Sequence, residues 1–315
     1  MINPKPKVSI CIPTYKQTFY LKRNLDSIVI QDFKDYEIII TDDTPDDTVE
    51  LFVKEYSNIF EGKLRYYRNK ISLGSPNNWN YAVSLSESEY VKILHHDDWF
   101  TRKESLRLFV EAIEKEKVDF VFSSTIVKSD DWEKNHQISK SQLVELKNDP
   151  CSLFFGNVIG APSVTLIRRS SILAFDPMIK WLVDVDFYIR ILLKVNDFYF
   201  LKEPLIATLS DGLHQITREC EFDAQIQVYE NYYLYKKIGF HIKEKDKAIE
   251  QLNQILKNYN IKSIRELKDY GVVGSMIPSS IWLYFIFKPL NFVKTEIKTF
   301  LSIVYHTIVS KKKTN

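Results

Sequence analysis

Short runs of apolar, mostly β-branched residues alternate with segments of helical spacing through the N-terminal part of the chain. These runs predict buried strands at Val8–Ile12, Tyr36–Thr41, Leu64–Tyr67, Tyr90–Leu94 and Val118–Ser123. The helices predicted between the first four strands are Leu21–Val29, Asp47–Tyr56 and Asn77–Leu85. Parallel strands buried on both faces are almost continuously apolar, and strands that alternate with helices form crossover units. The chain is therefore predicted to be an α/β protein with a mainly parallel sheet flanked by helices.

The rest of the chain has a different pattern, in which helical spacing dominates. The elements predicted there are a polar loop at Asp130–Pro150, a helix at Asp184–Val195, a strand at Phe198–Leu201, a long helix at Glu221–Lys257 and a short helix at Ser263–Tyr270. We expect a first domain at residues 1–220 and a C-terminal helical region at residues 221–315.

Charge and composition exclude several classes of function. The net charge is only +2, so the overall charge favours no nucleic-acid partner. Only 8 of the 315 residues are glycine, which disfavours a fold built on glycine-rich phosphate loops. Cys11, Cys151 and Cys220 lie far apart and are expected to be reduced thiols. The N-terminus has no apolar stretch typical of a secretory signal, and a cytoplasmic location is expected.

Polar clusters follow the ends of the predicted strands. They are Pro13-Thr14-Tyr15, Asp42-Asp43, Arg68-Asn69 and His95-His96-Asp97-Asp98. In open α/β sheets, ligands bind outside the carboxyl ends of the strands. The chemistry of this protein is therefore predicted to take place at that edge of the sheet.

Asp97 and Asp98 form the sharpest of these clusters. Adjacent carboxylates on a rigid strand end suit Mg²⁺ or Mn²⁺ beside a phosphate group. One alternative is that Asp98 caps a helix that begins after Thr101. Another is that His95 and His96 join the two aspartates around a transition metal, although adjacent strand residues face opposite sides.

Three further residues are candidates, each with a structural alternative. Asp43 can hydrogen-bond a base or ribose, or simply form a turn. Asp184, in the first turn of a helix, is a candidate general base or an ordinary first-turn acid, while Asp186 and Arg190 are expected to form a surface ion pair. His214 is a lone loop histidine that only its context could make a metal ligand or a phosphate contact.

These pieces occur in an order that resembles the family 2 glycosyltransferases, which are inverting enzymes with a GT-A fold. The segment VSICIPTYKQTFYLKRNLDSIVIQDFKDYEIIITDDT resembles the family's opening, and Asn69–Asn80 resembles its segment near the donor diphosphate. ILHHDDW occupies the place of the Asp-x-Asp metal motif, and DVDFYIR resembles the helix that carries the catalytic base. The resemblance covers about residues 7–215.

The resemblance implies a role for each candidate residue. Residues expected to bind the nucleotide are Pro13, Thr14, Tyr15, Asp43, Asn69, Asn80 and His96. Asp97 and Asp98, with His214, would hold Mn²⁺ or Mg²⁺ on the diphosphate. Asp184 would deprotonate the acceptor hydroxyl. The expected donor is a nucleotide sugar, a UDP-sugar by preference, and the expected acceptor is a saccharide, lipid-linked as is common in the family, in surface polysaccharide synthesis.

The sequence departs from the family pattern at four positions. His95 replaces the first Asp of the metal motif, and Trp79 replaces a frequent Arg before Asn80. Lys16 stands where Asn is common after Pro-Thr-Tyr, and Val183 stands where an acid often precedes the base.

The turn after the first predicted strand disfavours two other classes of enzyme. Pro13-Thr14-Tyr15-Lys16 contains no glycine, which disfavours a pyrophosphorylase or a dinucleotide oxidoreductase. A non-catalytic glycosyltransferase-like binding or scaffold protein remains the alternative.

The C-terminal segment from Met276 to Asn315 has an amphipathic pattern. Its apolar run Ile281–Phe287 is broken by Lys288-Pro289 and is far shorter than the roughly 20 residues that a spanning helix needs. The stripe beyond it is interleaved with lysines and ends in Lys311–Lys313, a pattern suited to an anionic membrane surface. We expect peripheral attachment to the inner face of the membrane, with a helical hairpin packed on protein as the alternative.

Overall fold

The computed structural model describes residues 5–129, 131–210 and 220–287. The described chain divides into two compact units, one of residues 1–223 and 241–243 and the other of residues 224–240 and 244–315. The first unit is built on a nine-stranded sheet, counted over the described residues, and the second is helical. The functional division after residue 220 stays a prediction.

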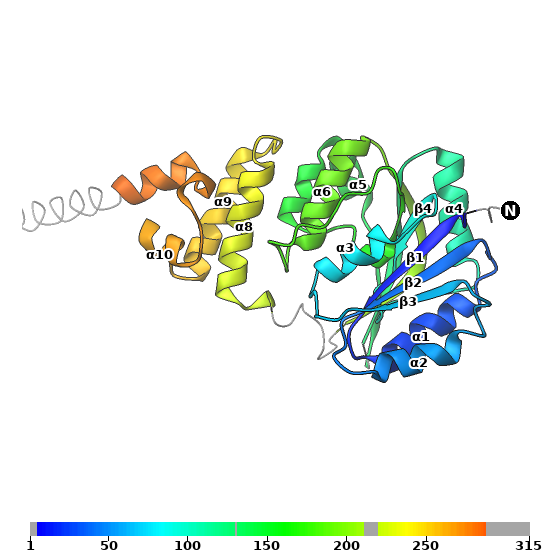
Figure 1. Cartoon of the computed structure of the whole chain (residues 1–315). Coiled ribbons are helices and arrows are strands. Elements are labelled where there is room, and N and C mark those ends of the chain that lie inside the picture. The colour runs from blue at the N-terminus through cyan, green and yellow to red at the C-terminus, as the bar shows by residue number, and fades with distance from the viewer. Residues whose placement is uncertain (1–4, 130, 211–219, 288–315) are drawn as a thin grey trace, which may run out of the picture. The chain divides into compact units, whose positions relative to one another are not determined.

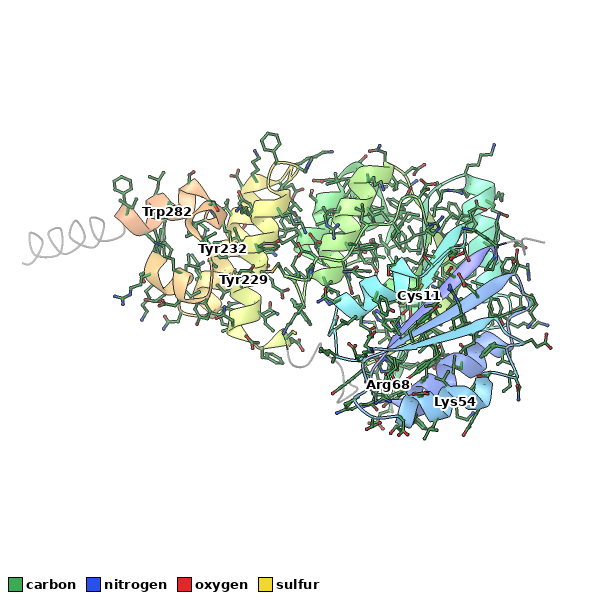
Figure 2. All side chains as sticks on the ribbon, viewed as in Figure 1. Cys11, Lys54, Arg68, Tyr229, Tyr232 and Trp282 are labelled. Atoms are coloured by element: carbon green, nitrogen blue, oxygen red, sulfur yellow. The ribbon has the colours of Figure 1, made fainter. Side chains whose placement is uncertain are left out.

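The N-terminal part of the sheet follows the predicted alternation of strands and helices (Figure 1). Its elements are β1 (Val8–Thr14), α1 (Thr18–Val29), β2 (Tyr36–Asp42), α2 (Thr48–Tyr56), β3 (Leu64–Arg68), α3 (Asn77–Ser84) and β4 (Tyr90–Ile93). β1 pairs in parallel with β2 and β4, and β2 pairs in parallel with β3. All seven residues of β1 are buried, as expected for a central strand covered on both faces. Figure 2 shows Cys11 of β1 in this interior.

The helices of this part cover the sheet because their apolar residues recur at helical spacing. In α1, Leu21, Leu25 and Ile28 are completely buried, and each such side chain contributes about 1.5–3 kcal/mol through burial. Asn24 is also buried on that apolar face. Figure 1 shows α1 and α2 side by side along the β1–β3 part of the sheet.

The second half of the sheet is mixed. Its elements are β5 (Trp99–Phe100), α4 (Ser105–Glu116), β6 (Phe120–Lys128), β7 (Glu133–His136), α5 (Lys140–Asn148), η1 (Pro150–Phe155), η2 (Pro162–Val164), β8 (Thr165–Arg168), α6 (Val183–Val195) and β9 (Tyr199–Leu209). The strand order is β3-β2-β1-β4-β8-β6-β9-β5, with β7 beside β6. β8 is antiparallel to both β4 and β6, whereas β6 and β9 are parallel. The predicted α/β fold with a mainly parallel sheet is confirmed.

Two predicted elements are wrong. The expected loop at Asp130–Pro150 contains β7 and α5, because Ser139 and Gln142 form a capping box that starts α5. The expected long helix at Glu221–Lys257 is two helices, α8 (Ala224–Ile238) and α9 (Lys245–Asn258). Gly239 lies immediately after α8, and a glycine after the last helical residue favours the end of a helix.

The helical unit continues with α10 (Ile264–Asp269) and η3 (Gly274–Met276), and residues 279–287 are helical. Trp282 donates its indole N–H to the carbonyl oxygen of Gly274 at 3.3 Å, and Ile281 is buried. Figure 2 labels Trp282 together with Tyr229 and Tyr232 of α8. Throughout the described ranges, no helix is both long enough and apolar enough to span a membrane.

Candidate active site

The turn from His95 to Asp98, called the acidic turn below, follows the carboxyl end of β4. Asn24 of α1 binds two backbone carbonyl groups of this turn. Its side-chain amide donates to His95 O at 2.9 Å and to Asp98 O at 2.7 Å. The hydroxyl of Ser163 in η2 accepts a hydrogen bond from the backbone N–H of His95 at 2.9 Å. The turn is thus fixed by α1 on one side and by η2 on the other.

The capping alternative for Asp98 is wrong. Asp98 is followed by the short strand β5, and α4 begins only at Ser105 with Glu104 in the capping position. Asp98 is buried. Burial raises its pKa, and the negative charge of Asp97 raises it further. Hydrogen bonds from the Ser163 hydroxyl and the Leu209 backbone act in the opposite direction and lower the pKa. Since Asp97 is only half-buried, it is the more accessible of the two carboxylates.

The two histidines of the turn do not complete a metal site with the aspartates. Among the described residues, no group of three or more His, Cys, Asp or Glu side chains is arranged to hold a metal ion. His95 Nδ1 lies 3.9 Å from Asp98 Oδ2, and burial lowers the pKa of His95 to about 4. His96 is half-buried beside Asp97. His214 lies outside the described residues.

Asp184 lies in the first turn of α6. One of its carboxylate oxygens is completely buried and has no hydrogen-bond partner among the described residues. Burial raises the pKa of Asp184 to about 7. A carboxyl group with this pKa exchanges its proton near neutral pH, as a general base must.

Tyr188 lies one helical turn after Asp184 in α6. Its hydroxyl is completely buried and donates to the carbonyl oxygen of Gly160 at 3.0 Å. Burial raises the pKa of Tyr188, and so do the negative charges of Asp184 and Asp98. The negative charges of both Asp184 and Asp98 thus act on the same phenol.

The next residues of α6 correct a prediction. Arg190 donates to Asp186 through Nε at 2.8 Å, but Asp186 is completely buried, so the pair is not a surface pair. Arg190 also donates to the carbonyl oxygen of Ala174 at 2.9 Å. Arg190, oriented by its pair with Asp186, thus links α6 to the preceding loop.

Asp43 organises the loop after β3. Its carboxylate accepts hydrogen bonds from the side chain of Asn69 at 2.7 Å, from Leu73 N at 2.9 Å and from Gly74 N at 2.8 Å. Its own N–H donates to Thr14 O at 3.1 Å. A carboxylate has about four acceptor positions, and three of those of Asp43 are taken by these hydrogen bonds.

The other predicted nucleotide residues occupy two places. Pro13 and Thr14 end β1; the Thr14 hydroxyl is buried without a hydrogen-bond partner among the described residues, and Tyr15 is half-exposed. Asn80 is used within the protein, because its side chain donates to Phe175 O and accepts from Phe175 N, both at 2.8 Å. Asn80 therefore ties α3 to the loop that precedes α6.

Asn24 and Ser163 are site residues that the sequence analysis missed. An asparagine on the apolar face of α1 was the available signal for Asn24, because a buried amide needs polar partners. Ser163 has no comparable signal in the sequence, since its partners Lys92, His95 and Asp98 lie 65 or more residues away.

The profile of the family described as Glycosyl transferase family 2 matches residues 9–174. The chain is 28% identical over 209 residues to the uncharacterized protein MT1568 of Mycobacterium tuberculosis, covering 61% of this chain and 64% of that protein. It is 33% identical over 94 residues to GalNAc(5)-diNAcBac-PP-undecaprenol beta-1,3-glucosyltransferase of Campylobacter jejuni, covering 30% of each chain. The chain thus spans less than two thirds of the length of both relatives.

Solved structures agree with this match at the level of the fold. S. aureus TarS 1-349 in complex with UDP-GlcNAc superposes with a TM-score of 0.61 at 20% identity, over 79% of this chain and 71% of that one. Mannosyltransferase PcManGT from Pyrobaculum calidifontis, in complex with GDP-Man and Mn²⁺, gives a TM-score of 0.54 at 14% identity, over 91% of this chain and 84% of that one. The expected GT-A fold is confirmed.

Proposed function

This chain belongs to glycosyl transferase family 2 and is a glycosyltransferase, and from that premise we propose that it transfers a sugar with inversion from a nucleotide sugar to a saccharide hydroxyl. A UDP-sugar is the first choice of donor, since TarS is described in complex with UDP-GlcNAc. The observation that carries the proposal is the Asp184 carboxylate, whose buried oxygen accepts no hydrogen bond from a described residue.

Asp184 is the proposed general base. Its carboxylate takes the proton of the acceptor hydroxyl, whose oxygen forms a bond to the anomeric carbon of the donor. The bond between that carbon and the diphosphate oxygen breaks on the opposite face, and its electron pair leaves with the nucleoside diphosphate. The support is the pKa of about 7 and the buried carboxylate oxygen, which accepts no hydrogen bond from a described residue.

Asp97 and Asp98 are the proposed holders of Mn²⁺ or Mg²⁺. Such ions are commonly bound by one or two carboxylates together with substrate phosphates, so two adjacent aspartates fit the ion without a third protein ligand. The mutual repulsion that raises the pKa of Asp98 would also be relieved by a cation. When bound, the metal stabilises the negative charge of the departing diphosphate. Asn24 and Ser163 keep the acidic turn in place for this role.

The nucleoside pocket is proposed between the ends of β1 and β2 and the loop after β3. Asp43 holds that loop, and its fourth acceptor position is proposed for the base. Thr14, with its buried hydroxyl, and the half-exposed Tyr15 complete this wall with Pro13. Asn69 supports Asp43 directly, and His96 lies in the acidic turn.

A lipid-linked acceptor in surface polysaccharide synthesis is proposed, with docking of the chain at the inner face of the membrane. One support is the undecaprenol-linked substrate named for the Campylobacter relative. Another is the helical segment 279–287, where Leu283, Tyr284, Ile286 and Phe287 are about half exposed. The amphipathic stripe beyond Phe287 lies outside the described residues.

The experiment is a panel of UDP-, GDP- and dTDP-sugars with Mn²⁺, in which release of the nucleoside diphosphate and the configuration of the product are followed. Release from one donor class and an inverted product are expected. Retention of the donor configuration would exclude Asp184 as the base of a single displacement. Binding of a donor without any release or transfer would favour the alternative, a non-catalytic binding protein.

A further inference from the structure

The strand that leads into the acidic turn, β4, contains a buried lysine. Lys92 lies in β4, five residues before Asp97, and its side chain is completely buried. Withdrawing an ammonium group from water is costly unless hydrogen bonds and nearby charges compensate. An apolar residue of similar length would fill the same space without that cost, so packing alone does not account for a lysine here.

The ammonium group of Lys92 binds the backbone of one short segment, from Ser163 to Thr165. It donates to the carbonyl oxygen of Ser163 and, at 3.0 Å, to that of Thr165, at the junction of η2 and β8. The aromatic ring of Phe109 lies beneath it, with the ring centroid 4.2 Å from Nζ. The backbone pairing of β4 with β8 includes Tyr90 and Val91 and ends there. The side chain of Lys92 then supplies the next hydrogen bonds between β4 and this segment.

The segment held by Lys92 is the one that fixes the acidic turn. The Ser163 hydroxyl accepts from the N–H of His95 at 2.9 Å, which leaves its own hydrogen to donate, and that hydrogen bond goes to the Asp98 carboxylate. A continuous chain of contacts thus runs from the Lys92 ammonium through the backbone and hydroxyl of Ser163 to Asp98. Burial lowers the pKa of Lys92 well below its usual range, and the negative charge of Asp98 opposes that shift.

We propose that Lys92 is a positioning residue for the acidic turn, acting through Ser163 to hold Asp98 and Asp97 in the arrangement that binds a divalent cation with the donor diphosphate. The inference rests on the proposed function, because it needs the acidic turn to bind the cation. Lys92 itself touches neither substrate nor metal. Outer partners of this kind typically change metal affinity about 10- to 100-fold when they are removed.

The test is a calorimetric titration of the full chain with the nucleoside diphosphate of the best donor, UDP in the first instance, with and without Mn²⁺. In Lys92→Met, we expect the gain in affinity due to Mn²⁺ to fall about tenfold, while the affinity without metal stays unchanged. Ser163→Ala should lose a similar factor. The double variant should lose no more than either single variant, because both changes break the same chain of contacts.

The control is Val91→Ala, a truncation of the neighbouring buried residue of β4, which should lower the melting temperature without changing the Mn²⁺-dependent gain. A Lys92→Met variant with the full gain would overturn the proposal, and so would losses that multiply in the double variant. If Lys92→Met fails to fold, Ser163→Ala decides alone, and its full gain would overturn the proposal. A wild type that shows no Mn²⁺-dependent gain refutes the metal role of the acidic turn, and the proposal with it.

Discussion

Trp79 of α3 packs against His95 of the acidic turn, with ring centroids 4.5 Å apart and ring planes inclined by 41°. Both residues depart from the family pattern, in which an Arg and an Asp are common at these positions. The structure shows that the two departures are neighbours. The two rings form an aromatic pair between α3 and the acidic turn. Trp79 also meets Phe175 edge to face at 5.2 Å.

Replacing Trp79 with Ala should raise the pKa of His95. Burial holds that pKa at about 4, and removing the indole admits water, so the pKa should move toward the ordinary value near 6.5. NMR titration of the histidine ring protons measures the change. Trp132→Ala, at an exposed position, is the control and should leave the His95 pKa at about 4. An unchanged pKa in Trp79→Ala would mean that other neighbours exclude water from the His95 imidazole.

Replacing Asp184 with Asn should separate catalysis from stability. The variant should lose about 10²- to 10⁴-fold in kcat, while donor binding survives. In the wild type, activity should rise with pH and level off above about 7, where the base is ionised. A pH profile that is flat from 5 to 9 would exclude Asp184 as the base.

The same variant should be more stable than the wild type at pH 8. The folded-state pKa of Asp184, about 7, lies above its ordinary value of 3.8, so this group stabilises the folded state less and less as the pH rises from about 4 through 7. We expect Asp184→Asn to gain about 1–3 kcal/mol at pH 8 and almost nothing at pH 4, measured by denaturant unfolding. Asp186→Asn, two residues further on, should instead lose about 1–3 kcal/mol, because it breaks the pair with Arg190.

Removing the metal or Asp97 should have the same consequence for transfer. EDTA should silence the wild type, and Mn²⁺ or Mg²⁺ should restore it. Asp97→Ala should abolish activity and leave the protein folded, because Asp97 repels the buried Asp98. The matched control is Asp46→Ala, which removes an exposed carboxylate that accepts from Thr48 N at 3.0 Å and should leave the activity unchanged. Near-normal turnover of Asp97→Ala in EDTA would refute the metal assignment.

Replacing Lys16 with Asn should stabilise the protein. Lys16 has a φ of 63°, in the left-handed region that asparagine tolerates better than lysine. This geometry gives a physical reason for the asparagine that is common at this position in the family. We expect a gain of about 0.5–1 kcal/mol in the free energy of unfolding. Lys22→Asn in the exposed face of α1 is the control and should lose a similar amount, because it breaks the pair with Asp26 and lowers helix propensity.

The sequence predicted the parts of the fold that depend on local pattern. The strands β1 to β4 and the helices between them have the expected period, and the polar residues at their ends meet at one edge. The insertion of β8 between β4 and β6 was not predicted, because β8 is a strand of only four residues and it pairs with residues of β4 that are 76 and 78 positions away. The capping box at Ser139 and the glycine after α8 were visible signals that the sequence analysis overlooked.

The site was predictable to the extent that its residues lie at strand ends. Asp97, Asp98 and Asp43 could be selected for that reason alone. Burial could not be predicted in the same way: Asp186 was expected at the surface and is completely buried. The hydrogen bonds of Asn24 and Ser163 to the acidic turn are contacts between distant segments, which a local pattern does not contain.

The last prediction concerns the C-terminal segment, and the deletion that tests it has to spare the helical unit. A cut at Pro278 would remove Ile281, which is buried, and Trp282, which donates to Gly274, so it would damage the helical unit itself. Deleting residues 288–315 spares both contacts and removes the stretch with the basic stripe. In flotation with liposomes that contain anionic lipid, the full chain should rise with the vesicles at low salt and the deletion variant should stay below, because the lysines supply about 1 kcal/mol each near such a surface.

The exposed apolar residues of segment 279–287 provide the second half of that experiment. Leu283→Ser with Ile286→Ser should weaken flotation, because apolar area that would enter the lipid boundary is lost. Phe240→Ser, at the most exposed large apolar residue among those described, is the control and should float normally. High salt should release the full chain partly, since screening removes the electrostatic part of the attraction and leaves the apolar part. A full chain that stays in the soluble layer at low salt would mean that the segment packs on protein, and membrane docking would then be wrong.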